Sequence, residues 1–206
     1  MRATLPNILS VILPSKLSAK IGLTQNKELR VNEVLKHCNG SLLDYGCGDN
    51  LLVKRYEDFG VGVDYSLSSK ADIIVNEYGR LPFESESFDT ISMIAVLNYI
   101  KTDLRIMVLA ELLRVLKVNG KLVVTCIDPL IGFIRHSMLT KSEYDQMIME
   151  EGGHDRGLSK KYVTNLIESV GFNLVFHKRF SLFLNNIYLF EKNGVQNESD
   201  PNKPAE

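Results

Sequence analysis

The sequence has no tryptophan, few cysteines and no excess of charge of either sign. Its three cysteines are odd in number and lack C-x-x-C spacing, so we expect neither a disulfide framework nor a zinc cluster. No apolar run reaches the length of about 18 residues that spans a bilayer. The 24 Lys and Arg against 25 Asp and Glu lack the basic excess of a nucleic-acid-binding protein. We therefore expect a cytoplasmic protein with reduced thiols, no metal site and no nucleic-acid partner.

The 206 residues, 45% of them apolar, suit one folded domain. Residues 1–26 form an apolar and basic N-terminal arm, and residues 27–192 form the domain itself. Residues 193–206 are polar and contain two prolines, so they cannot bury enough surface to offset the entropy of ordering. We expect that tail to be disordered.

Short apolar runs alternate with segments of helical period in the domain, which is typical of a parallel sheet covered by helices on both faces. Apolar spacing predicts a helix over residues 104–116, which Asn119 and Gly120 end before the next strand. Five parallel strands are expected, at residues 41–45, 60–64, 71–75, 90–94 and 121–126. The fold class is therefore α/β, a doubly wound Rossmann-like sheet.

The pattern changes after residue 126. Ser159 is placed to cap a helix that ends at Gly171. The apolar runs 172–176 and 184–190 follow, with Arg179, Phe180 and the pair Asn185-Asn186 as interruptions. Too little chain separates the runs for a helical crossover, so they should pair as an antiparallel hairpin at the end of the sheet.

The sharpest local signal is a glycine turn at residues 44–50, where a strand leads into a helix. Gly46 and Gly48 allow positive φ and close approach of a ligand, and the helix start offers free N–H groups. The alternative is an ordinary strand-to-helix turn. Asp64, at the end of the next strand, can accept hydrogen bonds from ribose hydroxyls, or it can be a solvated strand-end carboxylate.

These pieces, followed in order by the segments 81–83, 87–90 and 111–125, resemble the class I S-adenosylmethionine-dependent methyltransferases. The likeness is to the type 11-like, small-molecule branch, and more narrowly to enzymes of glycan or lipid synthesis. The resemblance implies S-adenosylmethionine as cofactor. It also implies a binding site formed by the glycine turn, the strand-end acid and an adenine-side pair: Asp44, Gly46, Cys47, Gly48, Asp64, Tyr65, Glu77 and Tyr78.

Within that set, the resemblance places the glycine turn at the methionine end of the cofactor and Asp64 on the ribose. Tyr65 would lie against the adenine ring, and Glu77 and Tyr78 near the adenine amino group. Glu77 is longer than the aspartate usual in the family, and a surface loop pair is the alternative for Glu77 and Tyr78. A small side chain in the turn explains Cys47 better than a nucleophile does.

The sequence departs from the family pattern at two places. Asn50 stands where a third glycine is common, and Asn98-Tyr99 stands where many members have Glu-His. Asparagine tolerates left-handed backbone better than most residues, so the turn can survive. The second departure bears on the acceptor.

Methyl transfer to oxygen or nitrogen can require a base, for which His154 is the leading candidate. It lies in the polar insert before the last helix, where this fold carries its acceptor site, and a loop-stabilising role is the alternative. His136 and Tyr99 are weaker candidates, whereas His37 and His177 suit structural positions.

The arm and the segment 127–139 suggest the acceptor. Residues 1–40 carry six Lys or Arg against two Glu, interleaved with apolar residues. Such a segment can make peripheral contact with an anionic membrane, or it can pack over the sheet edge or the active-site mouth. We expect a small-molecule, lipid-like or glycan acceptor, methylated at oxygen. A non-catalytic partner subunit and a nicotinamide-dependent oxidoreductase are the alternatives.

Overall fold

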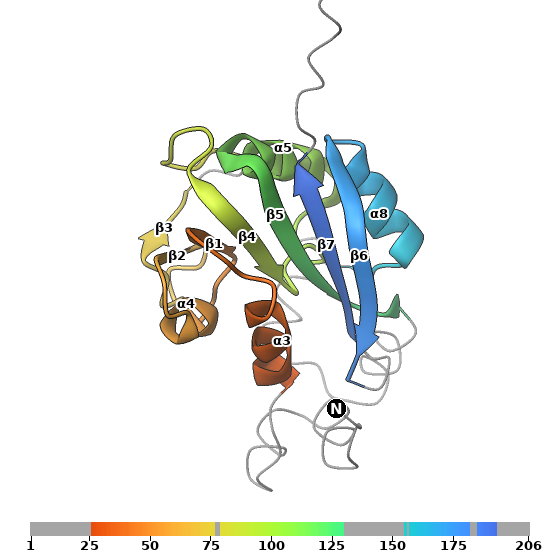
Figure 1. Ribbon diagram of the computed structural model, residues 1–206, viewed down its shortest axis with the longest axis horizontal. Helices are drawn as coiled ribbons and strands as arrows, with labels where there is room; N and C mark the ends of the chain where they lie inside the picture. Colours follow the sequence, from red (N-terminus) through yellow and green to blue (C-terminus); the bar gives the residue numbers. More distant parts are fainter. Residues whose placement is uncertain (1–25, 77–78, 130–154, 156, 182–184, 193–206) are drawn as a thin grey trace, which may run out of the picture.

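One mixed sheet of seven strands organises the protein, in the order β3-β2-β1-β4-β5-β7-β6 (Figure 1). This computed structural model describes residues 26–76, 79–129, 155, 157–181 and 185–192, so the tail and residues 1–25 of the arm lie outside the described residues. The strands are β1 Leu42–Tyr45, β2 Gly60–Asp64, β3 Ile73–Ile74, β4 Phe88–Ile94, β5 Leu116–Ile127, β6 Phe172–Phe180 and β7 Asn185–Lys192.

The pairing confirms the expected sheet. Strands β1 to β5 run parallel to one another, while β7 lies between β5 and β6 and is antiparallel to both. The strand order reverses between β1 and β4, which are adjacent although two strands separate them in the sequence. Ligands of open α/β sheets bind outside the carboxyl ends of the strands at such a reversal. The ends of β1, β2 and β4 are therefore where a site is expected.

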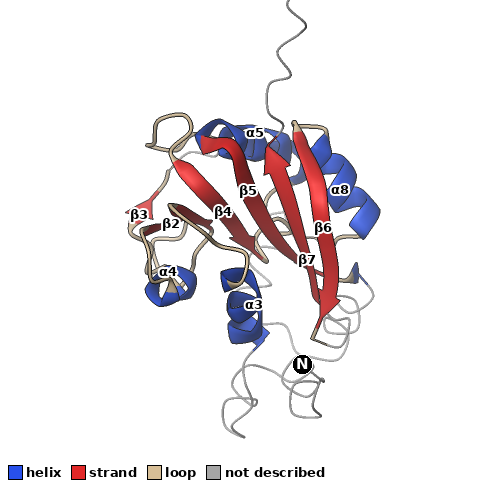
Figure 2. Cartoon of the chain, viewed as in Figure 1, coloured by secondary structure: helices blue, strands red, loops and turns tan. Residues whose placement is uncertain are grey.

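Helices cover both faces of the sheet, as Figure 2 shows. They are α3 Asn26–Leu35, α4 Leu51–Arg55, α5 Arg105–Val115 and α8 Lys160–Glu168, with a 3₁₀ turn, η1, at Thr102–Leu104. Alternation along β1 separates two cores: Leu42 packs with Val31 of α3, whereas Leu43 belongs to the core that contains Leu112 of α5. In the described part of the chain, no helix is long and apolar enough to cross a membrane.

The predicted cap of the last helix is confirmed, but the last parallel strand begins earlier than predicted. Ser159 Oγ accepts the Tyr162 N–H at 3.2 Å and begins α8. The helix α5 ends at Val115, and β5 begins immediately, at Leu116. Asn119 does not end the helix; it adopts φ 61° inside β5, where the pairing with β4 shifts register. Asparagine tolerates that backbone, so the strand continues through an irregularity.

The polar residues expected to interrupt the hairpin are also part of its strands. Arg179 and Phe180 lie in β6, and Asn185 and Asn186 begin β7. Both asparagines are buried, and each has a side-chain partner: Arg30 Nε donates to Asn185 Oδ1 at 2.9 Å, and His177 Nε2 lies 3.0 Å from Asn186 Oδ1. Satisfied amides can be buried in a strand, which the sequence pattern could not show.

Candidate functional site

The glycine turn after β1 has one glycine that packs against a neighbouring loop and one that has free space beside it. Gly46 has φ 74°, and a Cβ atom there would lie 2.4 Å from Val96 Cγ2, so the turn closes directly against the loop after β4. Gly48 has φ 56°, but a Cβ atom there would approach no described neighbour more closely than Lys27 Nζ, at 4.0 Å. The backbone of Gly48 is therefore accessible to a ligand.

Asn50 replaces the third glycine without breaking the turn. It adopts the left-handed conformation, with φ 58° and ψ 36°. Its Nδ2 donates to Asp72 Oδ2 at 3.0 Å, and the same oxygen accepts the Gly62 N–H at 2.7 Å. This contact ties the turn to β2 and to the start of β3, and it was not foreseen from the sequence. The helix that follows, α4, has only five residues.

Asp64 lies beside the open glycine. Its Oδ2 accepts the Gly48 N–H and its Oδ1 accepts the Ser66 N–H, each at 2.8 Å. The half-buried carboxylate is thus held between the end of β2 and the turn. A carboxylate oxygen has two lone pairs, so each oxygen can still accept a hydrogen bond from a ligand hydroxyl.

Asp44 forms the floor of the turn at the end of β1. Its side chain is buried, and Ser92 Oγ of β4 donates to Asp44 Oδ1 at 2.7 Å. Burial raises the pKa of Asp44 to about 7; the Ser92 hydrogen bond acts in the opposite direction, and the charge of Asp64 adds to the rise. Two acids of different depth therefore lie close together at the ends of β1 and β2.

Tyr65 and Cys47 complete the predicted residues that the structure describes near the turn. The Tyr65 ring meets the Tyr45 ring edge-on, with centroids 6.4 Å apart, and packs against the larger core. Cys47 is buried, which raises the pKa of its thiol to about 12. A thiol held protonated in this way is a poor nucleophile, consistent with a packing role for Cys47.

Three predicted site residues, Glu77, Tyr78 and His154, lie outside the described residues, as does His136. Their placement stays a prediction. The structure therefore brings Asp44, Gly46, Gly48 and Asp64 together at one edge of the sheet, with Cys47 and Tyr65 beside them.

The loop after β4 is fastened by a residue that the sequence reading missed. Arg105 is fully buried and donates to Ile100 O at 2.9 Å, to Tyr162 OH at 2.8 Å and to Asp155 Oδ2 at 2.5 Å. The Asp155 N–H in turn donates to Asn98 O at 3.0 Å. The signal was present: Arg105 shares the helical face of Val108, Leu109 and Leu112, where a charged residue needs buried partners.

The described residues on either side of 130–154 meet beyond the end of β5. The Leu158 N–H donates to Ile127 O at 3.1 Å. A Cβ atom on Gly157 would lie 2.7 Å from Pro129 Cα, so only glycine allows these two backbones to pack so closely. The two ends of the stretch 130–156 are thereby joined at the end of β5.

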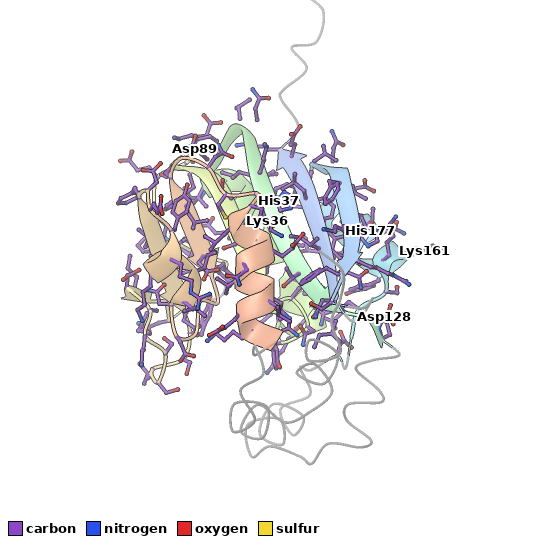
Figure 3. All side chains as sticks on the ribbon, turned by 60° about the horizontal axis from the view of Figure 1, so that its bottom comes forward. Lys36, His37, Asp89, Asp128, Lys161 and His177 are labelled. Atoms are coloured by element: carbon purple, nitrogen blue, oxygen red, sulfur yellow. The ribbon has the colours of Figure 1, made fainter. Side chains whose placement is uncertain are left out.

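His37 and His177 make structural contacts, as expected. Figure 3 labels both: His37 comes at the end of α3 and His177 from β6. The His37 ring lies 5.6 Å from the Phe176 ring, and burial lowers the His37 pKa. His177 lies 4.7 Å from the Tyr188 ring. Over the described part of the chain, no group of three or more His, Cys, Asp or Glu could hold a metal ion.

The motif segments after the site meet one another. Glu111 Oε1 accepts the Leu81 N–H at 2.7 Å, and Arg114 donates to Phe83 O at 2.8 Å and to Glu111. These contacts join α5 to the loop before β4. The segment 81–83 is therefore held against the end of α5 by Glu111 and Arg114.

Comparison with known proteins identifies a matching family over part of the chain. Residues 43–124 match the family described as a methyltransferase domain, a stretch that runs from β1 into β5 and covers less than half of the chain. No curated protein matches the sequence.

Solved structures share the fold over most of the chain. A protein from Pyrococcus horikoshii has a TM-score of 0.63 at 21% identity, over 88% of this chain and 93% of its own. A SAM-dependent methyltransferase from Thermotoga maritima, described as a possible histamine N-methyltransferase, has a TM-score of 0.58 at 16% identity, over 81% and 89%. The complex of the Haloferax volcanii Trm112 methyltransferase activator with a putative methyltransferase gives 0.62 at 12% identity, over 84% and 92%. The fold is that of the S-adenosylmethionine-dependent methyltransferases.

Proposed function

We propose that the chain is an S-adenosylmethionine-dependent methyltransferase that methylates a small-molecule, lipid-like or glycan acceptor at oxygen. The observation that carries the proposal is the Asp64 carboxylate, fixed by the Gly48 N–H beside the accessible backbone of that glycine. The match of residues 43–124 to a methyltransferase domain supports the same activity.

The described residues fit this cofactor. Both Asp64 oxygens keep a lone pair for the ribose hydroxyls, and Gly48 leaves space for close backbone approach. When bound, the cofactor supplies a methyl group already activated on a sulfonium. Little covalent help is then needed from the protein, and the work of these residues is to bind and orient the reactants.

The acceptor class is proposed from the sequence and from the loop after β4. That loop packs on the glycine turn through Val96 and Gly46, and Asn98 and Tyr99 follow in the same loop. Asn98 is buried, while Tyr99 is 37% exposed. A screen of lipid, quinone and glycan acceptors with a labelled methyl donor tests this part; methyl transfer to none of these classes argues against it.

The proposed activity is tested first by calorimetric titration with S-adenosylhomocysteine and, in parallel, with NAD. We expect binding of S-adenosylhomocysteine alone, with a dissociation constant of about 1–100 μM. Binding of NAD alone would favour a nicotinamide-dependent oxidoreductase. Binding of neither ligand by folded protein would favour a non-catalytic partner subunit.

Asp64→Ala should weaken the binding of S-adenosylhomocysteine by about 1.5–3 kcal/mol, because charge-assisted hydrogen bonds to the ribose are lost. The matched control is Asp58→Ala, which removes the same charge from an exposed residue before the other end of β2. The control should leave affinity unchanged. Equal affinities in wild type and Asp64→Ala would show that the ribose lies elsewhere.

A further inference from the structure

Lys27, in the first turn of α3, lies over the open side of the glycine turn. Among described residues outside its own stretch of chain, Lys27 Nζ is the atom nearest the Cβ position of Gly48, at 4.0 Å. The same ammonium group pairs with the Asp49 carboxylate, and both side chains are partly exposed. The ion pair joins α3 to the turn across 22 residues of sequence.

The turn is surrounded by positive charge on its outer side. The pKa of Asp49 is lowered by its hydrogen bond to Lys27 and by the charges of Lys27, Lys70 and Lys54. On the side of the turn that faces the strand ends the charges are negative, because Asp44 and Asp64 lie there. Among the described residues, an anionic ligand group therefore finds favourable partners on the outer side of the turn.

The proposed cofactor carries a carboxylate at its amino-acid end, which the family resemblance places at this turn. A carboxylate that loses water without a cation nearby is strongly disfavoured. Lys54 is less suited to pair with it, because its Nζ donates to the backbone oxygen of Asp49 at 2.8 Å. Lys27 differs, since it pairs with a side-chain carboxylate that another carboxylate can replace.

We propose that Lys27 binds the carboxylate of S-adenosylmethionine and that Asp49 competes with the cofactor for the same ammonium group. The inference rests on the proposed function and deepens it. Binding then exchanges one ion pair for another, and α3 contributes to the cofactor site through a residue that sequence reasoning did not select.

The exchange predicts opposite effects from the two partners. Lys27→Met removes the cation and should weaken the binding of S-adenosylmethionine about three- to tenfold. Asp49→Asn removes the competitor and should strengthen it about two- to threefold. Lys27→Arg keeps the charge and should retain most of the wild-type affinity.

The decisive measurement compares S-adenosylmethionine with its decarboxylated form, which keeps adenosine, sulfonium and amine, by calorimetry at low salt. The affinity of the decarboxylated ligand should not change with Lys27→Met or Asp49→Asn. Lys54→Met is the matched control, because it removes a nearby lysine charge and should affect both ligands alike and weakly.

Each outcome decides between the two proposals. Equal losses for both ligands in Lys27→Met, or no gain for S-adenosylmethionine in Asp49→Asn, would overturn the Lys27 assignment while leaving the methyltransferase proposal in place. If folded wild-type protein binds neither ligand, the proposed function fails and the inference fails with it.

Discussion

At Asp44, one substitution should increase the stability of the fold and weaken the binding of the proposed cofactor. Its raised pKa means that the folded state holds the proton more tightly than the unfolded state does. The stabilisation by that proton is complete below the unfolded pKa, about 3.9, and is lost as the pH rises through about 7. Asp44→Asn, which removes this ionisation, should be more stable than wild type at pH 8 on the order of 2–4 kcal/mol.

Urea denaturation between pH 4 and pH 8 measures this prediction, with the gap between the two proteins widening as the pH rises. S-adenosylhomocysteine should bind the variant more weakly. Asp89 provides a control of opposite sign: hydrogen bonds from Lys117 and Ser41 lower its pKa to about 2. Stability from Asp89 is present above pH 4 and is lost toward pH 2, so Asp89→Asn should destabilise at neutral pH. Parallel curves for Asp44→Asn and wild type would contradict the assignment.

At the scale of elements, the pair Arg105 and Asp155 fastens α5, α8 and the loop after β4. The two partners differ in depth: the side chain of Arg105 is 1% exposed and that of Asp155 is 47% exposed. Asp155→Ala leaves a buried guanidinium without its counter-charge and should cost about 3 kcal/mol or more of unfolding free energy. Arg105→Met leaves a carboxylate that water can solvate, and should cost about 1–2 kcal/mol.

A double-mutant cycle by urea denaturation separates these effects. The double variant should be close in stability to Arg105→Met alone, because the buried charge is absent from both. If Arg105→Met proved the more damaging single change, packing of the long side chain would outweigh charge pairing.

Sequence patterns predicted the elements where one local signal dominates. The strand β2 has the predicted bounds, and Ser159 caps α8 as expected. The pattern failed at Asn119, where the same residue that can end a helix can also sit inside an irregular strand. The pattern also failed to predict the buried amides at the start of β7, because their partners come from other elements.

At the scale of the whole molecule, it was predictable that the proposed cofactor residues lie close together, because parallel strands end at the same edge. Asp44, Gly48 and Asp64 meet there. The supporting contacts were not predictable, because they join residues far apart: Lys27 with Asp49, and Arg105 with Asp155. A lysine on a helix is ordinarily a solvated side chain, and no spacing marks its partner.

The sheet and its helices should fold without residues 130–154, because the chain on either side is already joined by the Leu158 to Ile127 hydrogen bond and by the contact of Gly157 with Pro129. A variant in which a linker of about four glycine and serine residues replaces 130–154 should unfold cooperatively and bind S-adenosylhomocysteine, since four residues span up to about 14 Å. Circular dichroism in urea and calorimetry measure both properties. Loss of cooperative unfolding would show that the removed residues complete the core.

The junction of Pro129 and Gly157 also makes this position a natural insertion point for a reporter. Pro129 and Gly157 lie side by side, so a domain with adjacent termini inserted between them would strain the rest of the protein little. A fluorescent protein placed there would sit beyond the end of β5, next to the loop that Arg105 fastens. Binding of S-adenosylhomocysteine could then be read as a change in emission, which would turn the protein into a sensor for the proposed cofactor.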